Sequence, residues 1–478
     1  MKCCEFPGRR IGLLILAFVP LAAAPGLPAA DAWQTDQATA GSQTGPAAND
    51  ESFERAVQLE SFDAVWNKIR QTHWDPERVG ESWDAAREKF RPRVEQAESI
   101  EEVRAALSQL LETLDQSHFG IIPRDDYETI EEEQSGGGEG TIGIEVRLLD
   151  DRLVVTRVVP GFPADQAGVR PGWVLTGLRG TTDDEIIERC SKVAEHSVMR
   201  LETIVGLATD GRSSGEPGTD ISMTFLDGDD QPHELSLTLA RAPGQLERLG
   251  NLPAFTVDWQ ARRLDGDIGY VRFNAFIGGP RLAREFARAV EEFHDSRGLV
   301  IDLRGNRGGL VALVAGMCGW LVSDRDPIGT MKMAGGTELN LVLNPRKFEI
   351  EDPAEEDGMR RVRFDRPVAV LIDECSISAA EIMAGGLRDL EAAEVFGSRT
   401  AGLVLPSVVT RLPNGDGFQY AMADYLSASG QTLEGDGVKP TREVRLDRQM
   451  LLERTDPVLD AARAWIGEQS DQPPPGDK

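Results

Sequence analysis

Apolar residues recur at helical spacing through the segment from Ser52 to Leu114. In its first half they are Phe53, Val57, Phe62, Val65, Trp66 and Ile69. Positions three or four residues apart share one face of a helix, so this pattern predicts an amphipathic helix. A second run starts at Ser99, which with Glu102 makes the S-x-x-E pattern that begins many helices. The sequence therefore predicts a helical N-terminal region over residues 52–130.

Short β-rich runs replace this pattern between Thr141 and Ala242. The runs TIGIEV and RLVVTRVV are rich in β-branched residues, and ISMTFLDGDDQPHELSLTLAR is typical of a hairpin. Between them, PGFPADQAGVRPGW supplies turn and short-helix signals. An acidic, glycine-rich linker, Tyr127–Gly140, precedes the change. We therefore expect a separate β-rich domain over residues 140–243.

Runs typical of strands and helices alternate from about Asn251 onward. IGYVRF and GLVIDLR are typical of strands, whereas PRLAREFARAVEEFH and LVALVAGMCGWLV are typical of helices. Such alternation predicts a layered α/β domain, here over residues 251–468. The acidic stretch Glu349–Gly358 is expected to form a surface loop, and residues 469–478 a disordered tail.

The N-terminus has the pattern of a secretory signal peptide. Basic residues precede an apolar stretch over residues 11–24, which is followed by small residues. We expect a signal peptide over residues 1–30, with cleavage after residue 24, 30 or 32, and a disordered spacer over residues 31–51. The predicted location is secreted or periplasmic; a retained membrane anchor is the alternative.

Composition excludes some classes of partner. With 51 Lys and Arg against 80 Asp and Glu, the chain carries a formal net charge of −29. That charge argues against nucleic acid and anionic membrane surfaces as partners. After removal of the signal, Cys190, Cys318 and Cys375 remain, too few for a disulfide framework and without the spacing of a zinc site. Cys318 and Cys375 lie in apolar segments and are expected to be buried thiols.

The segment Val368–Glu381, VAVLIDECSISAAE, is an apolar run that stops at a small-residue turn and restarts as a helix at Ser378. In one interpretation Ser378 only caps the helix, since with Glu381 it completes an S-x-x-E capping box. In the other, the serine lies at the edge of a sheet, where helix amides favour negative charge. Ser376 is a second candidate in the same turn.

Two other segments contain candidate functional groups, namely backbone amides in a glycine turn and a carboxylate in a second turn. Ile301–Leu310, IDLRGNRGGL, is a strand that ends in two glycines and so predicts a sharp turn with exposed amides. It is either an ordinary strand-to-helix turn or a donor of hydrogen bonds to an anion. Leu433–Pro440, LEGDGVKP, places Glu434 in a turn, where a carboxylate is either solvated or functional.

Together these segments resemble the C-terminal processing (tail-specific) serine proteases of family S41. The resemblance implies a crotonase/ClpP-like α/β catalytic domain, Ser378 as nucleophile, and an oxyanion hole made by the amides of Gly309 and Ala379. In the Ser-Lys members the segment matching GSRTAGLVLP reads T-x-G-K, whereas Leu403 stands at the lysine position here. Lys439, in a turn, offers no obvious substitute.

A histidine supplies the missing base if the chain is similar to the tricorn-like branch of this family. The helical region ends in L-x-x-L-x-x-SH, which resembles the base segment of that branch. The resemblance implies His118 as general base, oriented by Ser117 and by Glu434 of the segment that resembles E-G-x-G-V-x-P. The remaining histidines, His73, His196, His233 and His294, lie in polar contexts and are expected at the surface.

The β-rich domain resembles a PDZ domain through its V-x-P-G-x-P-A-x-x-A-G-V-x-P-G block. It departs from the pattern at Trp173, where aspartate is usual, and Asp183–Gly218 is longer than a minimal domain of this type needs. Such a domain can bind a peptide C-terminus on backbone amides. The candidate substrate-binding loop consists of Thr141, Ile142, Gly143 and Ile144.

The sequence thus predicts a serine endopeptidase that acts on proteins or peptides, in the tail-specific case through their C-termini, with no metal or organic cofactor. Homo-oligomerisation stays open. The first alternative is an inactive, peptide-binding scaffold, in which Leu403 stands at the lysine position because catalytic activity has been lost. The second is a carrier of small apolar ligands, since some relatives of this fold bind lipids or retinoids.

Overall fold

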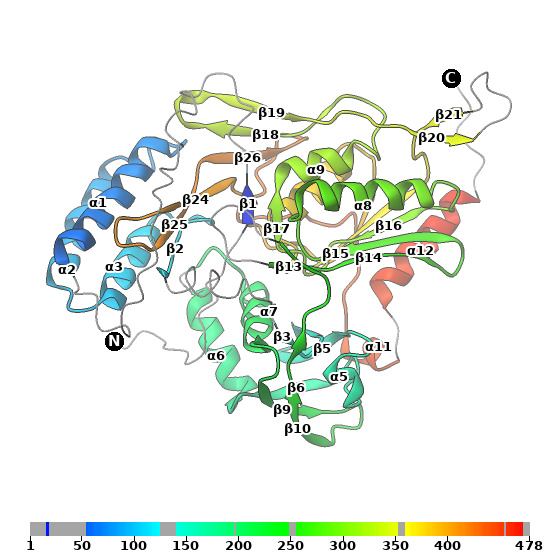
Figure 1. Cartoon of the computed structure of the whole chain (residues 1–478), viewed down its shortest axis with the longest axis horizontal. Helices are drawn as coiled ribbons and strands as arrows, with labels where there is room; N and C mark the ends of the chain where they lie inside the picture. The colour runs from blue at the N-terminus through cyan, green and yellow to red at the C-terminus, as the bar shows by residue number, and fades with distance from the viewer. Residues whose placement is uncertain are drawn as a thin grey trace, which may run out of the picture.

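The computed structural model describes residues 16–18, 54–124, 140–195, 197–247, 255–351, 359–453 and 456–471. Apart from residues 16–18, the predicted signal peptide and spacer lie outside these ranges, as does most of the predicted linker. Figure 1 shows three parts, which we call the helical region (residues 54–124), the β-rich module (residues 140–241) and the α/β unit (residues 255–471). No helix in these ranges combines the length and apolarity needed to cross a bilayer.

The helical region consists of three helices, and the two that contain the apolar runs of the sequence confirm the predicted helical character. Phe62, Val65 and Ile69 are buried and pack against apolar residues of the two following helices. Ser99 is the N-cap of the third helix, and its hydroxyl accepts a hydrogen bond from the Glu102 amide, which confirms the predicted helix start. The helices are α1 (Arg55–Thr72), α2 (Glu81–Gln96) and α3 (Ile100–Glu112).

The β-rich module is built on an antiparallel sheet with strand order β10-β9-β6-β5-β4, so β4 is an edge strand. The predicted hairpin is confirmed as β9 and β10. Between β6 and β9 the chain inserts two helices, α6 and α7, and α7 packs beside β4. The main strands are β4 (Ile144–Leu149), β5 (Arg152–Val158), β6 (Val174–Leu178), β9 (Asp220–Leu226) and β10 (Pro232–Thr238). Short strands are β3 (Gly140–Thr141), β7 (Thr181–Thr182), β8 (Ser214–Gly215) and β11 (Ala240–Arg241), and the helices are α5 (Pro163–Gln166), α6 (Asp183–Ala194) and α7 (Leu201–Arg212).

The α/β unit is centred on a six-stranded sheet of order β14-β15-β16-β22-β23-β27, parallel except at β14. Alternate residues of β15 face opposite layers: Val271 and Phe273 pack in the core beneath α8, α9 and α10, whereas Ile268 and Tyr270 pack against α12. The predicted layered α/β arrangement is therefore confirmed. The sheet strands are β14 (Trp259–Leu264), β15 (Ile268–Phe273), β16 (Leu299–Asp302), β22 (Val368–Ile372), β23 (Glu394–Gly397) and β27 (Arg442–Glu443). The helices are α8 (Gly279–Glu292), α9 (Val311–Cys318), α10 (Ala379–Asp389), α11 (Arg448–Leu452) and α12 (Pro457–Ser470).

A second sheet, of order β17-β1-β24-β25-β2, joins the helical region to the α/β unit, because β2 comes directly after α3 and pairs with β25. Its strands are β1 (Leu16–Phe18), β2 (Gly120–Ile122), β17 (Gly308–Leu310), β24 (Ser407–Arg411) and β25 (Gly417–Ala421). Three further strands form a separate sheet, β18 (Pro327–Met333), β19 (Glu338–Val342) and β26 (Ala423–Ser427).

Two expectations need correction at the periphery. The first residues of the expected loop Glu349–Gly358 belong to a hairpin strand, because β20 (Phe348–Glu351) pairs with β21 (Met359–Val362). Helix α12 continues to Ser470, beyond the expected start of the tail at residue 469. The remaining short pair is β12 (Gln245–Glu247) with β13 (Phe255–Val257).

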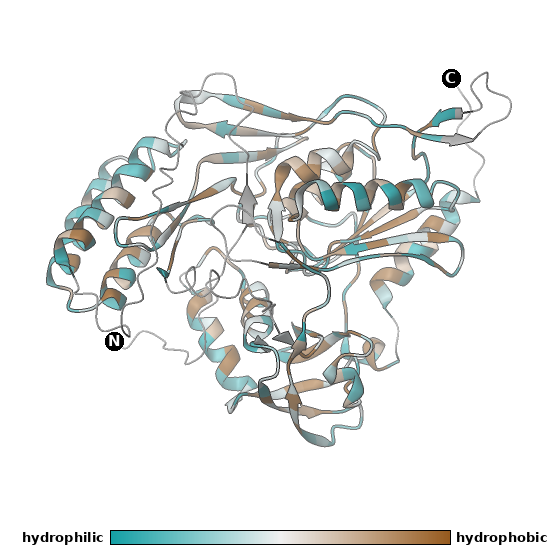
Figure 2. Ribbon diagram, viewed as in Figure 1, coloured by the Kyte–Doolittle hydropathy of each residue, from teal (hydrophilic) through white to brown (hydrophobic). Residues whose placement is uncertain are grey.

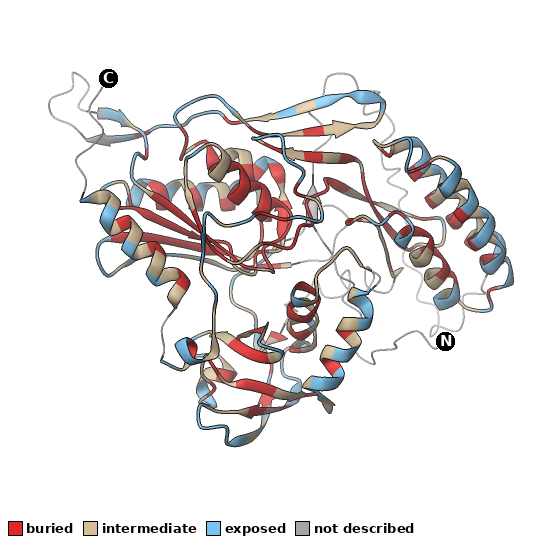
Figure 3. Cartoon of the chain, turned by 180° about the vertical axis from the view of Figure 1, so that it is seen from behind, coloured by how far each residue is buried: buried red, intermediate tan, exposed pale blue. Residues whose placement is uncertain are grey.

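Hydropathy and burial agree on where the main core lies. Figure 2 shows brown, apolar ribbon along the central strands and on the inner faces of the helices, with teal on the outer faces. Figure 3 shows that the buried positions gather in the central sheet of the α/β unit and in the helices that cover it. Cys190, Cys318 and Cys375 are all buried free thiols, as expected for the last two.

Candidate active site

Ser378 lies where β22 gives way to α10, as the N-cap residue of that helix. Its backbone has φ 61° and ψ −115°, a conformation that costs a residue other than glycine roughly 1–3 kcal/mol. The amide of Ser378 donates to Glu381 Oε2 at 2.9 Å, and the residue is fully buried. The rival Ser376 is held in the turn, where its hydroxyl donates to the Leu303 carbonyl at 2.8 Å. The Ser376 hydroxyl is therefore used within the turn, whereas Ser378 lies in a strained turn at a helix N-terminus, where it completes the predicted capping box with Glu381.

The glycine turn predicted to stabilise an oxyanion packs beside this serine. The amide of Ile377 donates to the Asn306 carbonyl at 2.9 Å, which ties the two turns together. Gly309 has φ 138°, and a Cβ there would lie 2.4 Å from the Phe276 carbonyl oxygen, so only glycine fits. Ala379 is the first residue of α10, whose early amides have no acceptor within the helix. Since β17 contacts α10, both predicted donors lie on neighbouring elements.

Ser117, His118 and Glu434 form one buried hydrogen-bonded chain. Ser117 Oγ lies 2.6 Å from His118 Nδ1 and 3.0 Å from Glu434 Oε2, and the Ser117 amide donates to Glu434 Oε1 at 2.8 Å. An ionised carboxylate only accepts, so Ser117 Oγ–H donates to Glu434 and accepts from His118 Nδ1–H. That tautomer leaves the lone pair on His118 Nε2, which has no hydrogen-bond partner among the described residues. The structure thus brings three of the four predicted catalytic residues into direct contact.

Burial determines the protonation states of His118 and Glu434 in this hydrogen-bonded network. Desolvation lowers the pKa of His118 to about 3, so its imidazole is neutral at pH 7. Desolvation also raises the pKa of Glu434 to about 7, although the amides of Val404 and Ser117 oppose the shift. His118 itself has φ 62°, a left-handed conformation that turns the loop after α3 inward. A neutral imidazole with an unprotonated Nε2 is the form that a general base requires.

The carboxylates of Glu381 and Glu434 bind consecutive backbone amides and so connect the part of the site around His118 with the part around Ser378. Glu381 accepts hydrogen bonds from the amides of Ser378 and Leu403, both at 2.9 Å. Glu434 accepts from the next amide, Val404, at 3.0 Å. The segment that contains Leu403 therefore holds both halves together. Because His118 Nε2 has no partner in the described chain, it does not hydrogen-bond to Ser378 in this arrangement.

Leu403 occupies an apolar environment. It is fully buried and clusters with Ile377 and with Val198, Met199 and Leu207 of the β-rich module. Lys439 lies apart, with a side chain that is 66% exposed and within 3.6 Å of Asp436. The environment of Leu403 suits an aliphatic side chain, and Lys439 remains at the surface as expected.

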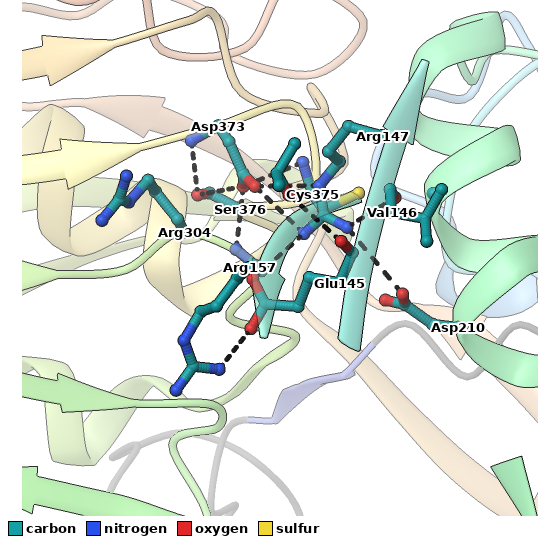
Figure 4. Close-up of polar contacts among 12 residues, drawn as sticks. Glu145, Val146, Arg147, Arg157, Asp210, Arg304, Asp373, Cys375 and Ser376 are labelled. Atoms are coloured by element: carbon teal, nitrogen blue, oxygen red, sulfur yellow. Dashed lines mark hydrogen bonds and ion pairs between the residues drawn. The ribbon is translucent and has the colours of Figure 1, made fainter. Parts of the chain in front are cut away.

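The β-rich module packs directly on the turn that carries Ser378, a contact that the sequence did not reveal. Arg147 of β4 is 2% exposed and points its guanidinium at Asp373, with Nε 3.1 Å from Oδ2, while Asp373 accepts from the amides of Gly305 and Cys375 (Figure 4). On α7, the Thr203 hydroxyl donates to the Glu374 carbonyl at 2.8 Å. The only signal in the sequence was the extra length of Asp183–Gly218, which forms α6 and α7.

The predicted substrate-binding loop is largely internal. Ile142 is fully buried and Ile144 is 8% exposed. The Gly143 amide donates to Thr141 Oγ1 at 3.0 Å, so this amide is already satisfied within the loop. Thr141 is half-buried. The loop leads into edge strand β4, next to α7.

The expectation that His73 is a surface residue was wrong. His73 is 5% exposed because its ring stacks on Trp74 and Phe119. Its Nε2 lies 2.8 Å from Gln116 Oε1, so it braces the loop that carries Ser117 and His118. His233 and His294 are half-buried, and His196 lies outside the described residues.

Two family models match the chain. Residues 267–444 match peptidase family S41, and residues 56–112 match the tricorn protease C1 domain. A probable CtpA-like serine protease of Staphylococcus haemolyticus (strain JCSC1435) is 24% identical over 342 residues, which is 71% of this chain and 59% of that protein. The chloroplastic carboxyl-terminal-processing peptidase 3 of Arabidopsis thaliana is 26% identical over 390 residues, 79% of this chain and 67% of that protein.

Solved structures agree on the fold. The photosystem II D1 C-terminal processing protease aligns with a TM-score of 0.54 at 20% identity, covering 86% of this chain and 98% of that one. Mature CPAF complexed with lactacystin aligns with a TM-score of 0.52 at 14% identity, covering 87% and 98%. The chain spans 59% of the staphylococcal relative. Over the matched residues the chain is therefore similar to serine peptidases of family S41, and this region is preceded by a segment similar to the tricorn protease C1 domain.

Proposed function

We propose that this protein is a secreted or periplasmic serine endopeptidase of the C-terminal processing type, with tricorn-like catalytic residues in place of a Ser-Lys dyad. The observation that carries the proposal is the hydrogen-bonded series from Glu434 through Ser117 to His118, which leaves His118 Nε2 unprotonated and without a partner among the described residues. The basic, apolar and small-residue pattern of the N-terminus supports the location.

In the proposed mechanism His118 Nε2 takes the proton of Ser378 as its Oγ attacks the scissile carbonyl. The amides of Gly309 and Ala379 stabilise the oxyanion, each contributing about 3–4 kcal/mol to the lowering of the barrier. The protonated His118 then gives its proton to the leaving amine, which departs and leaves an acyl-enzyme on Ser378. Water, deprotonated by His118, hydrolyses this ester. Ser117 and Glu434 keep the imidazole in one orientation throughout, as the third group of a triad does.

The substrates are proteins or peptides, and the β-rich module is a PDZ-like domain in this proposal. Strand β4 lies at an edge of its sheet and follows the Thr141–Ile144 loop, the arrangement in which a peptide end adds as a further strand. The contacts of α7 and Arg147 with the turn that carries Ser378 support a role for the module in presenting a peptide to that serine.

An inactive, peptide-binding scaffold is the competing function. It is favoured by the complete burial of Ser378 and by the absence of a hydrogen bond from His118 Nε2 to any described residue. In that case the same network would only stabilise the fold.

Labelling with a fluorophosphonate probe separates the two functions. The protein lacking residues 1–30 is compared with its Ser378→Ala and His118→Gln variants, and Lys439→Ala serves as a surface control. Labelling that is lost in both site variants and kept in the control supports the peptidase. Folded wild-type protein that stays unlabelled, with and without added C-terminal peptides, supports the scaffold.

A further inference from the structure

A cleft opens beside His118, between the helical region and the β-rich module. It is lined by the end of α3, by the loop that carries Ser117 and His118, and by residues 197–199 before α7. His118 is 3% exposed, and its Nε2 is without a hydrogen-bond partner in the described chain. A buried nitrogen of this kind in the wall of a cleft indicates that a ligand group belongs there.

The chemistry of the reaction says which part of a substrate would lie in this cleft. After acylation, the proton on His118 Nε2 passes to the amine of the leaving peptide, so that amine must approach Nε2 closely. The amine belongs to the residue directly after the scissile bond. The side chain of that residue therefore lies against the same wall as His118.

The walls of the cleft combine apolar sides with an acidic rim. Leu111, Phe119, Val198 and Met199 supply the apolar sides, whereas Glu112 and Asp115 are exposed carboxylates at the end of α3 and just beyond it. No lysine or arginine is among the residues lining the cleft in the described chain. A side chain with a long aliphatic stem and a cationic head matches both features.

We propose that this cleft is the binding site for the residue that follows the scissile bond, and that it selects lysine or arginine there. The inference rests on the proposed peptidase function. The stem of the basic residue packs between Phe119 and Met199, and its charge lies near Asp115 and Glu112. An acidic residue at the same position would meet two carboxylates and is disfavoured.

Cleavage of matched peptides tests this selection. Bonds cut in a library of blocked peptides are first identified by mass spectrometry, and the best peptide is then made with Lys, Arg, Leu or Glu after the bond. Exposed ion pairs are individually weak, so the two carboxylates should favour Lys over Glu by roughly tenfold in kcat/KM. The ratio should fall in 1 M salt, because the carboxylates are exposed to solvent.

Two variants locate the preference in the cleft. Asp115→Asn should reduce the Lys-to-Glu ratio several-fold, and asparagine accepts the positive φ of 51° at this position. Glu112→Lys, at the C-terminus of α3, should bring the ratio close to one or reverse it. Asp151→Asn is the matched control, since Asp151 is an exposed aspartate with φ 58° at the β4–β5 turn, and it should leave the ratio unchanged.

The outcomes separate this inference from the function on which it rests. Peptides that are cut at equal rates whatever follows the bond would overturn the selection while leaving the peptidase intact. A Lys preference that survives both cleft variants would place its origin elsewhere and would also overturn the inference. If no peptide in the library is cut by folded protein, the peptidase proposal fails and the selection fails with it.

Discussion

Replacing Ser117 with alanine is the most direct test of the proposed catalytic chain. The change removes only the hydroxyl, which lies 2.6 Å from His118 Nδ1 and 3.0 Å from Glu434 Oε2. The Ser117 backbone amide still donates to Glu434 Oε1 at 2.8 Å, so the loop keeps its anchor. In the variant, the imidazole loses the Ser117 Oγ acceptor for its Nδ1–H. The hydrogen bond that favours the tautomer protonated at Nδ1 is then lost.

The size of the effect follows from these contacts. Leaving one buried donor without a partner costs roughly 1–3 kcal/mol of stability. Because positioned acid–base catalysis is worth about 10²–10⁴-fold in rate, a misoriented His118 should slow the reaction by about 100-fold or more. The fall in rate should therefore be large while the protein stays folded at 25 °C.

The assay is the rate of fluorophosphonate labelling of Ser378, measured beside thermal unfolding of the same samples. Ser296→Ala is the matched control, since Ser296 is 1% exposed and its hydroxyl donates to the Phe293 carbonyl, away from the site. The control should lose some stability and keep its labelling rate. Ser117→Ala protein that is labelled as fast as wild type would refute the role of Ser117 in orienting His118.

The remaining predictions concern pH, the lysine position and the contact between modules. Burial raises the pKa of Glu434 from 4.5 to about 7, so the folded state binds this proton more tightly than the unfolded state does, and the contribution of Glu434 to stability falls by about 3 kcal/mol between pH 4.5 and 7. In urea unfolding, Glu434→Gln should therefore lose less free energy of unfolding than wild type across this pH range. Free energies of unfolding that fall with pH equally steeply in both proteins would contradict the shift. The labelling rate should rise as pH increases through 7 if ionised Glu434 orients the base, and a flat profile from pH 5 to 9 would argue against it. Leu403→Lys should lower the midpoint of thermal unfolding without raising the labelling rate, since it places an ammonium group among apolar side chains. Faster labelling of this variant would show that a Ser-Lys dyad can form here. Lys439→Ala should match wild type in both assays. Arg147→Met should destabilise the protein by about 3–5 kcal/mol, because the carboxylate of Asp373 loses its buried partner; equilibrium urea unfolding that matches wild type would show that this ion pair contributes nothing net.

Local patterns in the sequence determined much of the fold. The spacing of Phe62, Val65 and Ile69 is a property of one helix, and the start of α3 at Ser99 depends on a contact three residues away. The strands and helices of the α/β unit were predicted for the same reason, since buried parallel strands are continuous apolar runs. The pairing of Ser117-His118 with Glu434 was inferred from a resemblance, and the structure places these residues in contact.

Tertiary structure alone decided what surrounds the site. The sequence around Arg147 does not predict that Asp373, more than 200 residues later, is its ion-pair partner. The two residues lie in different elements, which come into contact only when the protein folds. Glu381 was identified from its local spacing as part of a helix cap, yet its carboxylate also binds the Leu403 amide. His73 was assigned to the surface because its neighbours in sequence are polar, whereas the stacking that buries it includes Phe119, on another segment. Contacts between neighbours in the chain leave a periodic trace in the sequence, and contacts between distant segments leave none.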